Sequence, residues 1–138
     1  MAKEFQLTVV APDREVVSET VQAVVAPGAA GSFGVLASHA PTISLLNTGL
    51  LEYLDMNNRR HYVAVGGGFA EVDGKQMTIL ADSAQRAQEI DIQREEQVLE
   101  QARRALRGED STMDPQQAMV EMERAINRIK TARNYGNL

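Results

Sequence analysis

The stretch Ala81–Glu95, with the sequence A-D-S-A-Q-R-A-Q-E-I-D-I-Q-R-E, marks a change in the period of the apolar residues. Before it, apolar and polar residues alternate, as in Phe5–Val10. After it, apolar residues recur at helical spacing, as in Val98–Leu106. Side chains alternate across a strand and repeat with each turn of a helix. The sequence therefore predicts a β-rich domain over residues 1–84 and a helical domain over residues 85–138.

The composition is that of an ordinary globular protein. Of the 138 residues, 43% are hydrophobic and 24% are charged, which is enough for a buried core. The net charge of −5 repels phosphate backbones and argues against a nucleic-acid partner. The absence of cysteine excludes disulfides and thiolate chemistry, and no apolar run approaches the roughly 20 residues that span a bilayer. These features predict a chain without a transmembrane segment that works in the cytosol or on a membrane complex.

The first domain contains several short apolar runs, each bounded by turn residues. Asp73-Gly74 is the strongest hairpin signal, and Asp55–Asn58 has the composition of a second turn. Three consecutive glycines, Gly66–Gly68, interrupt an apolar run and predict a bulge or a place where another backbone packs closely. The spacing of the runs predicts roughly eight to ten short strands in a sandwich or barrel.

A glycine-rich segment, Gly28–Pro41, predicts a shaped loop followed by a short strand. It contains His39, and His61 is the second of the two histidines in the chain. Without a cysteine or a G-x-S-x-G elbow, neither histidine has a nucleophile at a useful spacing. We therefore favour a packing or capping role for His39, keep a small hydrolase or isomerase as a weaker alternative, and predict no catalytic or metal-binding residue.

Two amphipathic helices are predicted in the second domain. Asp91 is a suitable N-cap for the first helix, and Gly108 is suited to end it. Asp114-Pro115 begins the second helix. The predicted buried faces are Val98, Leu99, Ala102, Ala105 and Leu106 in the first helix, and Ala118, Met119, Met122, Ala125, Ile126 and Ile129 in the second. Alanine buries little area, so this antiparallel hairpin should be only marginally stable by itself.

Several segments, taken in order, resemble the epsilon subunit of F-type ATP synthases. They are G-S-F-G-V-L-A-S-H-A-P at Gly31–Pro41, V-G-G-G-F-A-E-V at Val65–Val72, M-T-I-L-A-D at Met77–Asp82, and the two-helix tail. The resemblance covers essentially the whole chain. It implies an α+β fold, in which an N-terminal ten-stranded β-sandwich (residues 1–84) is followed by a C-terminal antiparallel two-helix hairpin (residues 85–138).

The resemblance also implies a function. Such subunits are non-catalytic parts of the rotor and need no cofactor; the sandwich binds the gamma subunit and the ring of c subunits, which couples proton flow to ATP synthesis. The hairpin can fold on the sandwich or extend along gamma into the alpha/beta catalytic head, where it inhibits ATP hydrolysis. The expected location is the cytoplasmic face of a bacterial cell membrane, as a peripheral subunit, and a thylakoid membrane is the other compatible setting.

Two sets of site residues follow from the resemblance. The expected subunit contact is formed by Gly31, Ser32, Phe33, Gly34 and His39. Phe33 either forms the exposed tip of the glycine loop or packs into the core. In some bacterial members, regulatory ATP binds the folded hairpin through an I-D-x-x-R-A motif and two arginines of the second helix. The corresponding residues are Ile90, Asp91, Arg94, Arg124 and Arg128.

The nucleotide site has an alternative interpretation. Arg124 and Arg128 are one turn apart on one helix face, where both can bind phosphate. However, Glu95 stands where the family motif has alanine, and Gln85 stands where ATP binders have an acidic residue. These departures favour a hairpin in which Asp91 only caps the helix and the arginines pair with Glu95, Glu96, Glu121 and Glu123. A stand-alone ATP-sensing module is the alternative function.

Overall fold

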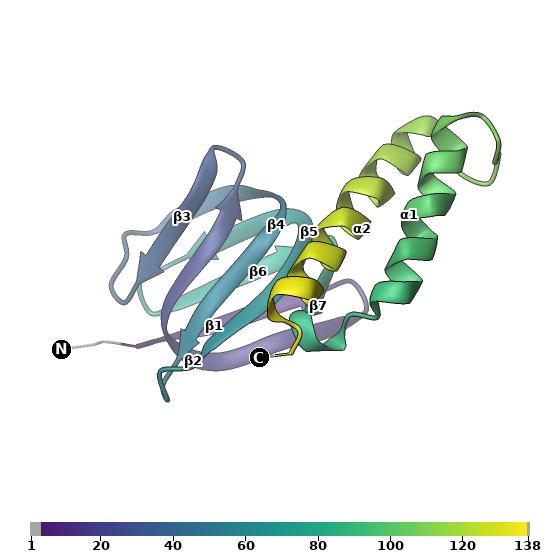
Figure 1. The fold of residues 1–138 in the computed structure, drawn as a ribbon. Coiled ribbons are helices and arrows are strands. Elements are labelled where there is room, and N and C mark those ends of the chain that lie inside the picture. The colour runs from purple at the N-terminus through teal and green to yellow at the C-terminus, as the bar shows by residue number, and fades with distance from the viewer. Residues whose placement is uncertain (1–3, 138) are drawn as a thin grey trace. The chain divides into compact units, whose positions relative to one another are not determined.

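The structure is a computed structural model that describes residues 4–137, and it divides into two compact units. The first unit extends to Arg86 and the second begins at Ala87. All strands of the described residues lie in the first unit and all helices in the second (Figure 1), which confirms the α+β class. The change of architecture comes two residues later than the sequence suggests, because Ala84–Arg86 forms a strand that pairs with Val63–Val65.

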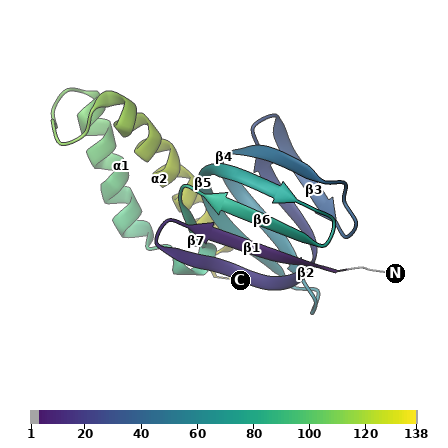
Figure 2. The same cartoon turned by 180° about the vertical axis from the view of Figure 1, so that it is seen from behind.

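Seven strands form the part of the first unit that the structure describes. They are β1 (Phe5–Ala11), β2 (Arg14–Gly28), β3 (Gly31–Leu36), β4 (Thr42–Asp55), β5 (Arg60–Val72), β6 (Gln76–Ala81) and β7 (Ala84–Arg86). Their order is β1-β6-β5-β4-β2-β3, with β7 beside β5. All neighbouring strands are antiparallel except β1 and β6, which are parallel. Since β1 also pairs with β2, the strands close on themselves around a common core (Figures 1 and 2).

The expectation of ten strands is wrong, because three strands are long and continue through irregularities. β2 has 15 residues, β4 has 14 and β5 has 13. β2 pairs with β1 over its first half and with β3 and β4 over its second half, and its register with β4 shifts between Val21 and Ala23. A strand that bends at such a point can pass from one layer of a sandwich to the other.

The core of the β unit is built from the inward-facing residues of the strands. In β1, Phe5, Leu7, Val9 and Ala11 are buried and the residues between them are partly exposed, as the alternation predicts. The largest fully buried side chains of the unit are Tyr53, Leu7, Leu51, Met77, Ile79, Val9, Val17, Val21, Val24, Val35, Val63 and Val65. Burial of such side chains contributes about 1.5–3 kcal/mol each and is the main favourable term in folding.

Both predicted hairpin turns are confirmed. Oδ1 of Asp55 accepts hydrogen bonds from the backbone N–H groups of Asn57 and Arg59, at 2.8 and 3.0 Å. Oδ1 of Asp73 accepts one from the backbone N–H of Gln76, at 3.0 Å. In each turn an aspartate holds the backbone of its own turn, which is the reason this residue type is common at such positions.

The close approach predicted at the glycine run is also confirmed. Gly67 and Gly68 have φ angles of 91° and 127°, which side chains disfavour. A Cβ atom on Gly68 would lie 2.1 Å from the carbonyl oxygen of Leu80 on β6. Only glycine therefore allows β5 and β6 to pair at this point.

The second unit consists of a 3-10 turn and two helices. They are η1 (Ala87–Glu89), α1 (Ile92–Leu106) and α2 (Pro115–Tyr135), and the two helices pack against each other in antiparallel orientation (Figure 1). The predicted caps are confirmed: Oδ1 of Asp91 accepts a hydrogen bond from the N–H of Arg94 at 3.3 Å, and Oδ1 of Asp114 accepts one from Gln117 at 2.8 Å. Gly108, with a φ of 76°, follows the end of α1.

The buried faces of the two helices are narrower than predicted. Leu106, Met119 and Ile126 are exposed, so their assignment to these faces is wrong. The inward face of α2 consists of buried or half-buried residues that are alternately four and three positions apart. They are Ala118, Met122, Ala125, Ile129 and Ala132. Ala118 packs against two alanines of α1. Because alanines let the helices approach closely, the larger apolar residues remain on the flanks.

Candidate functional site

Four large apolar side chains lie exposed on the outer face of the β unit. Leu45 on β4 pairs with Phe69 on β5, and Phe69 pairs with Leu80 on β6. Their exposed fractions are 69%, 42% and 44%, and Ile43, two residues before Leu45 on the same strand, is 76% exposed. We call these four residues the outer apolar row; Figure 2 shows the strands that carry it side by side. A contiguous exposed apolar patch is typical of a protein-binding surface.

The outer apolar row was not among the predicted site residues. Its neighbours Leu46, Ala70 and Ile79 are buried on the inner face. The available signal was a pair of consecutive large apolar residues within a strand, Leu45-Leu46 on β4 and Ile79-Leu80 on β6. Apolar residues on both faces of a strand indicate that both faces are covered by something.

The segment Gly31–Gly34 does not form the predicted loop. It is the first part of β3, where Phe33 pairs with Ala26 of β2, and the turn lies just before it. Phe33 is half-buried and packs against the core, so its placement at an exposed tip is wrong. Gly31, Ser32 and Gly34 are exposed, and His39 is half-buried like Phe33. The role of these five residues as a subunit contact stays a prediction.

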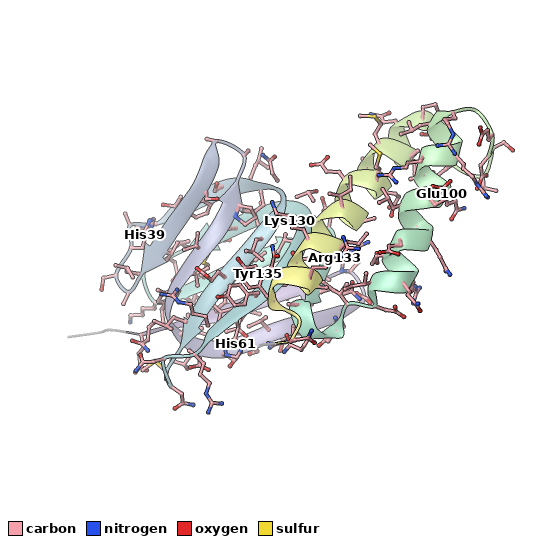
Figure 3. The ribbon with its side chains drawn as sticks, viewed as in Figure 1. His39, His61, Glu100, Lys130, Arg133 and Tyr135 are labelled. Carbon is pink, nitrogen blue, oxygen red and sulfur yellow. The ribbon has the colours of Figure 1, made fainter. Side chains whose placement is uncertain are left out.

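The two histidines lie in different surroundings, as Figure 3 shows. His39 follows β3, and its Nδ1 lies 2.8 Å from the carbonyl oxygen of Ala40. The ring of His61 stacks on Tyr53 with 4.7 Å between centroids, and its Nε2 lies 2.8 Å from Oδ2 of Asp55. Within residues 4–137, neither histidine has a hydroxyl group as hydrogen-bond partner. This geometry gives no support to the hydrolase alternative.

A polar network ties the end of β7 to β2 and β4. Arg86 donates hydrogen bonds from Nη1 to the hydroxyl of Tyr53, at 2.9 Å, and from Nε to the carbonyl oxygen of Val16, at 3.2 Å. Its Nη2 lies 3.5 Å from Oε2 of Glu19, and the Tyr53 hydroxyl donates to the same carboxylate. The last residue of the β unit is therefore held by three different groups.

Glu19, Asp55 and His61 also present their ligand atoms within 4.8 Å of one another, an arrangement that a metal ion could use. Each of these groups already has a protein partner. Arg86 and Tyr53 bind Glu19, and the hydrogen bond with His61 lowers the pKa of Asp55. Because a guanidinium so close to Glu19 disfavours a second cation, we interpret the three residues as part of the polar network.

Tyr53 should make the β unit sensitive to alkaline pH. Burial raises its pKa above the ordinary value, and the hydrogen bond to Glu19 raises it further. In the unfolded chain a tyrosine ionises near pH 10, so the free energy of unfolding should fall as the pH rises above about 10. We expect Tyr53→Phe to remove this part of the pH dependence and to lower stability at neutral pH by about 1–3 kcal/mol, since Arg86 and Glu19 lose a partner.

Urea unfolding of the unmodified chain and of Tyr53→Phe, measured from neutral to alkaline pH, tests this prediction. Tyr62→Phe is the matched control. Tyr62 is less buried than Tyr53, so its replacement should leave the alkaline loss of stability in place. An unchanged pH dependence in Tyr53→Phe would contradict the assignment.

In the helical unit, Arg128 on α2 reaches the first turn of α1. Its Nη1 lies 3.5 and 3.4 Å from the two carboxylate oxygens of Glu95, which is buried. Arg124 is one turn away on the same flank of α2. Its Nη1 lies 3.8 Å from Glu121, and its Nε is buried without a hydrogen-bond partner among residues 4–137. Two of the alternative pairings, Arg128 with Glu95 and Arg124 with Glu121, are therefore present.

The other predicted nucleotide-binding residues precede or begin α1. Ile90 is half-buried, Asp91 is the N-cap, and the side chain of Arg94 is exposed in the first turn. The antiparallel packing places Arg128 near the first turn of α1, where it forms an ion pair with Glu95. Gln85, which stands where ATP binders have an acidic residue, belongs to β7 in the other unit. The binding of a nucleotide by these residues stays a prediction.

The opposite flank of the hairpin carries a groove of about 540 Å³. It is lined by Glu96, Leu99, Glu100, Arg103, Ile126, Ile129, Lys130, Arg133 and Asn134. Glu96 and Arg133 form an ion pair across the two helices at 2.8 Å, and Figure 3 shows Arg133 and Lys130 on α2 and Glu100 on α1. The two flanks thus differ: one holds a buried ion pair, and the other holds exposed charges around apolar residues.

Among residues 4–137, neither helix is long and apolar enough to cross a membrane. Residues 4–87 match the family described as ATP synthase, Delta/Epsilon chain, beta-sandwich domain. The chain is 40% identical to the ATP synthase epsilon chain of Desulforamulus reducens, over 96% of this chain and 99% of the relative. It is 42% identical to the ATP synthase epsilon chain of Nitratidesulfovibrio vulgaris, over 97% of this chain and 99% of the relative.

Solved structures give the same result. A chain in the cryo-EM structure of the Euglena gracilis mitochondrial ATP synthase, comprising OSCP, F1 and the c-ring, matches with a TM-score of 0.77 at 26% identity, over 98% of this chain and 84% of that chain. A chain in the central stalk and c-ring of the Tetrahymena thermophila mitochondrial ATP synthase shares the fold, with a TM-score of 0.56 at 13% identity, over 95% of this chain and 97% of that chain.

Proposed function

Because the chain belongs to the family of ATP synthase epsilon chains, we propose that it is a non-catalytic subunit of the central stalk. It couples proton-driven rotation to ATP synthesis, and its helices inhibit ATP hydrolysis. Its partners are then the gamma subunit, the c-subunit ring and, through the helices, the alpha/beta head. Its location is the cytoplasmic face of the membrane, as a peripheral subunit. No cofactor is required for this role.

The outer apolar row is the observation that carries the assembly role. It presents four large apolar side chains to solvent on three adjacent strands. Burial of a fully exposed side chain of this size is worth about 1.5–3 kcal/mol, so a complementary protein surface would be bound favourably. We assign the row to the gamma subunit. The predicted contact residues Gly31, Ser32, Phe33, Gly34 and His39 remain candidates for a second contact, with the c-ring.

The packing of the helices supports the regulatory role. One buried cluster between them consists of Ala102, Ala105 and Ala118, with Met113 and Met122 packed against it. These side chains bury little apolar area, so little apolar stabilisation is lost when a surface with larger side chains replaces this contact. We therefore propose that the two helices separate in the complex. Regulatory ATP favours the closed form, in which α1 and α2 are packed against each other, and it is bound by Ile90, Asp91, Arg94, Arg124 and Arg128.

Removal of the helices tests the regulatory role in the reconstituted complex. The truncated chain should end at Arg86 rather than Ala84, because Arg86 makes three contacts that hold β7. We expect it to bind gamma as the full chain does and to raise the rate of ATP hydrolysis. Loss of gamma binding, or an unchanged rate of hydrolysis, would contradict the proposal.

A disulfide staple provides a second test, with the helices still present. The chain has no cysteine, so Ala102→Cys combined with Ala118→Cys introduces two thiols in the packed cluster. Oxidation should hold the hairpin closed and raise hydrolysis, and a reducing agent should reverse the effect. The single variant Ala102→Cys is the matched control and should show no response to oxidation.

A further inference from the structure

The ion pair between Glu95 and Arg128 is far more buried than the pair next to it. The side chains of Arg128 and Glu95 are 16% and 9% exposed, whereas those of Arg133 and Glu96 are 61% and 50% exposed. An exposed pair contributes little to stability. Breaking a buried pair by removing one partner is costly, because the other charge is left uncompensated. Without Glu95, closing the two helices on each other would therefore leave the charge of Arg128 largely buried and uncompensated.

The position of Glu95 explains why its carboxylate is buried. Glu95 lies seven residues before Ala102, so both face α2. The carboxylate reaches the flank of α2 that carries Arg124 and Arg128. Arg124 brings a buried Nε with no hydrogen-bond partner among residues 4–137. Two guanidinium groups one turn apart favour an anion beside them, and Glu95 supplies a negative charge from within the chain.

We propose that Glu95 is an internal counter-ion that takes the place of a phosphate group beside Arg128, so that the hairpin closes without a nucleotide. This inference rests on the proposed binding of ATP by Arg124 and Arg128. A carboxylate and a phosphate oxygen compete for the same Nη1 of Arg128, and their like charges repel each other. Glu95 therefore stabilises the closed hairpin in the absence of ligand and weakens the binding of nucleoside triphosphate.

Replacement of Glu95 should reverse both properties in the full-length chain. We expect Glu95→Ala to bind MgATP at least about tenfold more tightly than the unmodified chain, a difference of about 1.4 kcal/mol. Glu95→Gln, which keeps the size of the side chain, separates the effect of charge from that of packing and should show a gain in the same direction. Titration calorimetry with MgATP and with inorganic phosphate measures the affinities, and phosphate alone distinguishes recognition of the phosphate group from recognition of the nucleoside.

Glu96→Ala is the matched control, because it removes the same charge from the adjacent residue on the other flank of the hairpin. Its affinity for MgATP should stay within about twofold of that of the unmodified chain. This is well below the gain of about tenfold, or about 1.4 kcal/mol, expected for Glu95→Ala. Adding Arg128→Ala to Glu95→Ala should abolish the gain. Hydrogen exchange gives a second readout: without ligand, the α1 amides should exchange faster in Glu95→Ala than in the unmodified chain, and MgATP should restore their protection.

Equal MgATP affinity in Glu95→Ala and the unmodified chain, including no binding by either, would overturn the inference. So would an equal gain in Glu96→Ala, or unchanged exchange of the α1 amides in Glu95→Ala. These outcomes are distinct from failure of the proposed function. That failure would appear in the reconstituted complex as hydrolysis that does not respond to removal of the helices.

Discussion

Gly68→Ala is expected to lower the free energy of unfolding of the β unit by at least about 3 kcal/mol. Two separate effects add at this position. The φ angle of 127° is one that residues with a side chain rarely adopt. In addition, the new Cβ would lie 2.1 Å from the Leu80 carbonyl oxygen and 2.8 Å from the Cα of Ala81, so the backbone of β6 would have to move.

Gly31→Ala separates these two effects. Gly31 has almost the same φ angle, 125°, but a Cβ placed there would have no heavy atom within 4 Å. Only the conformational cost applies, so the loss should be about 1–2 kcal/mol. Urea unfolding followed by circular dichroism measures both variants. Equal losses in the two variants would show that the contact between the β5 and β6 backbones is not what requires glycine at residue 68.

Phe69→Asp is expected to weaken the binding of the gamma subunit by at least about 30-fold, which corresponds to about 2 kcal/mol. Phe69 lies in the middle of the outer apolar row, between Leu45 and Leu80. An aspartate there would place a charge among the apolar side chains that the partner covers, where its desolvation is costly. Phe69 is 42% exposed in the free chain, so the substitution also removes packing within the sheet, and the free protein should lose about 1 kcal/mol of stability while it stays folded.

Met56→Asp is the matched control for this prediction. Met56 is 47% exposed, close to the 42% of Phe69, but it lies in the turn between β4 and β5 outside the outer apolar row. Its replacement should leave the affinity for gamma within about twofold, as is usual for residues outside an interface centre. Calorimetric titration of gamma with the three proteins measures the difference. Similar affinities for Phe69→Asp and the unmodified chain would remove the row from the interface.

Features that depend on neighbouring residues could be read directly from the sequence. The caps at Asp91 and Asp114 and the turns at Asp55 and Asp73 are hydrogen bonds within a few residues, so the local sequence contains both partners. The order of the family's segments likewise indicated the family. The long β2 strand was missed because its bend arises from pairing with three different strands, which no local pattern encodes.

The change from strands to helices, the class of fold and the family are evident from the residues alone, since they depend on hydrophobic period and local motifs. Which apolar residues stay exposed depends on how the elements pack. The period places Leu45 and Phe69 each on one face of its own strand. The pairing of β4, β5 and β6 brings these side chains together into a patch. The same holds for Glu95 and Arg128, whose 33-residue separation is closed only by the packing of α1 on α2. In both cases the decisive contact joins residues distant in the chain, and such contacts are set by the packing of whole elements.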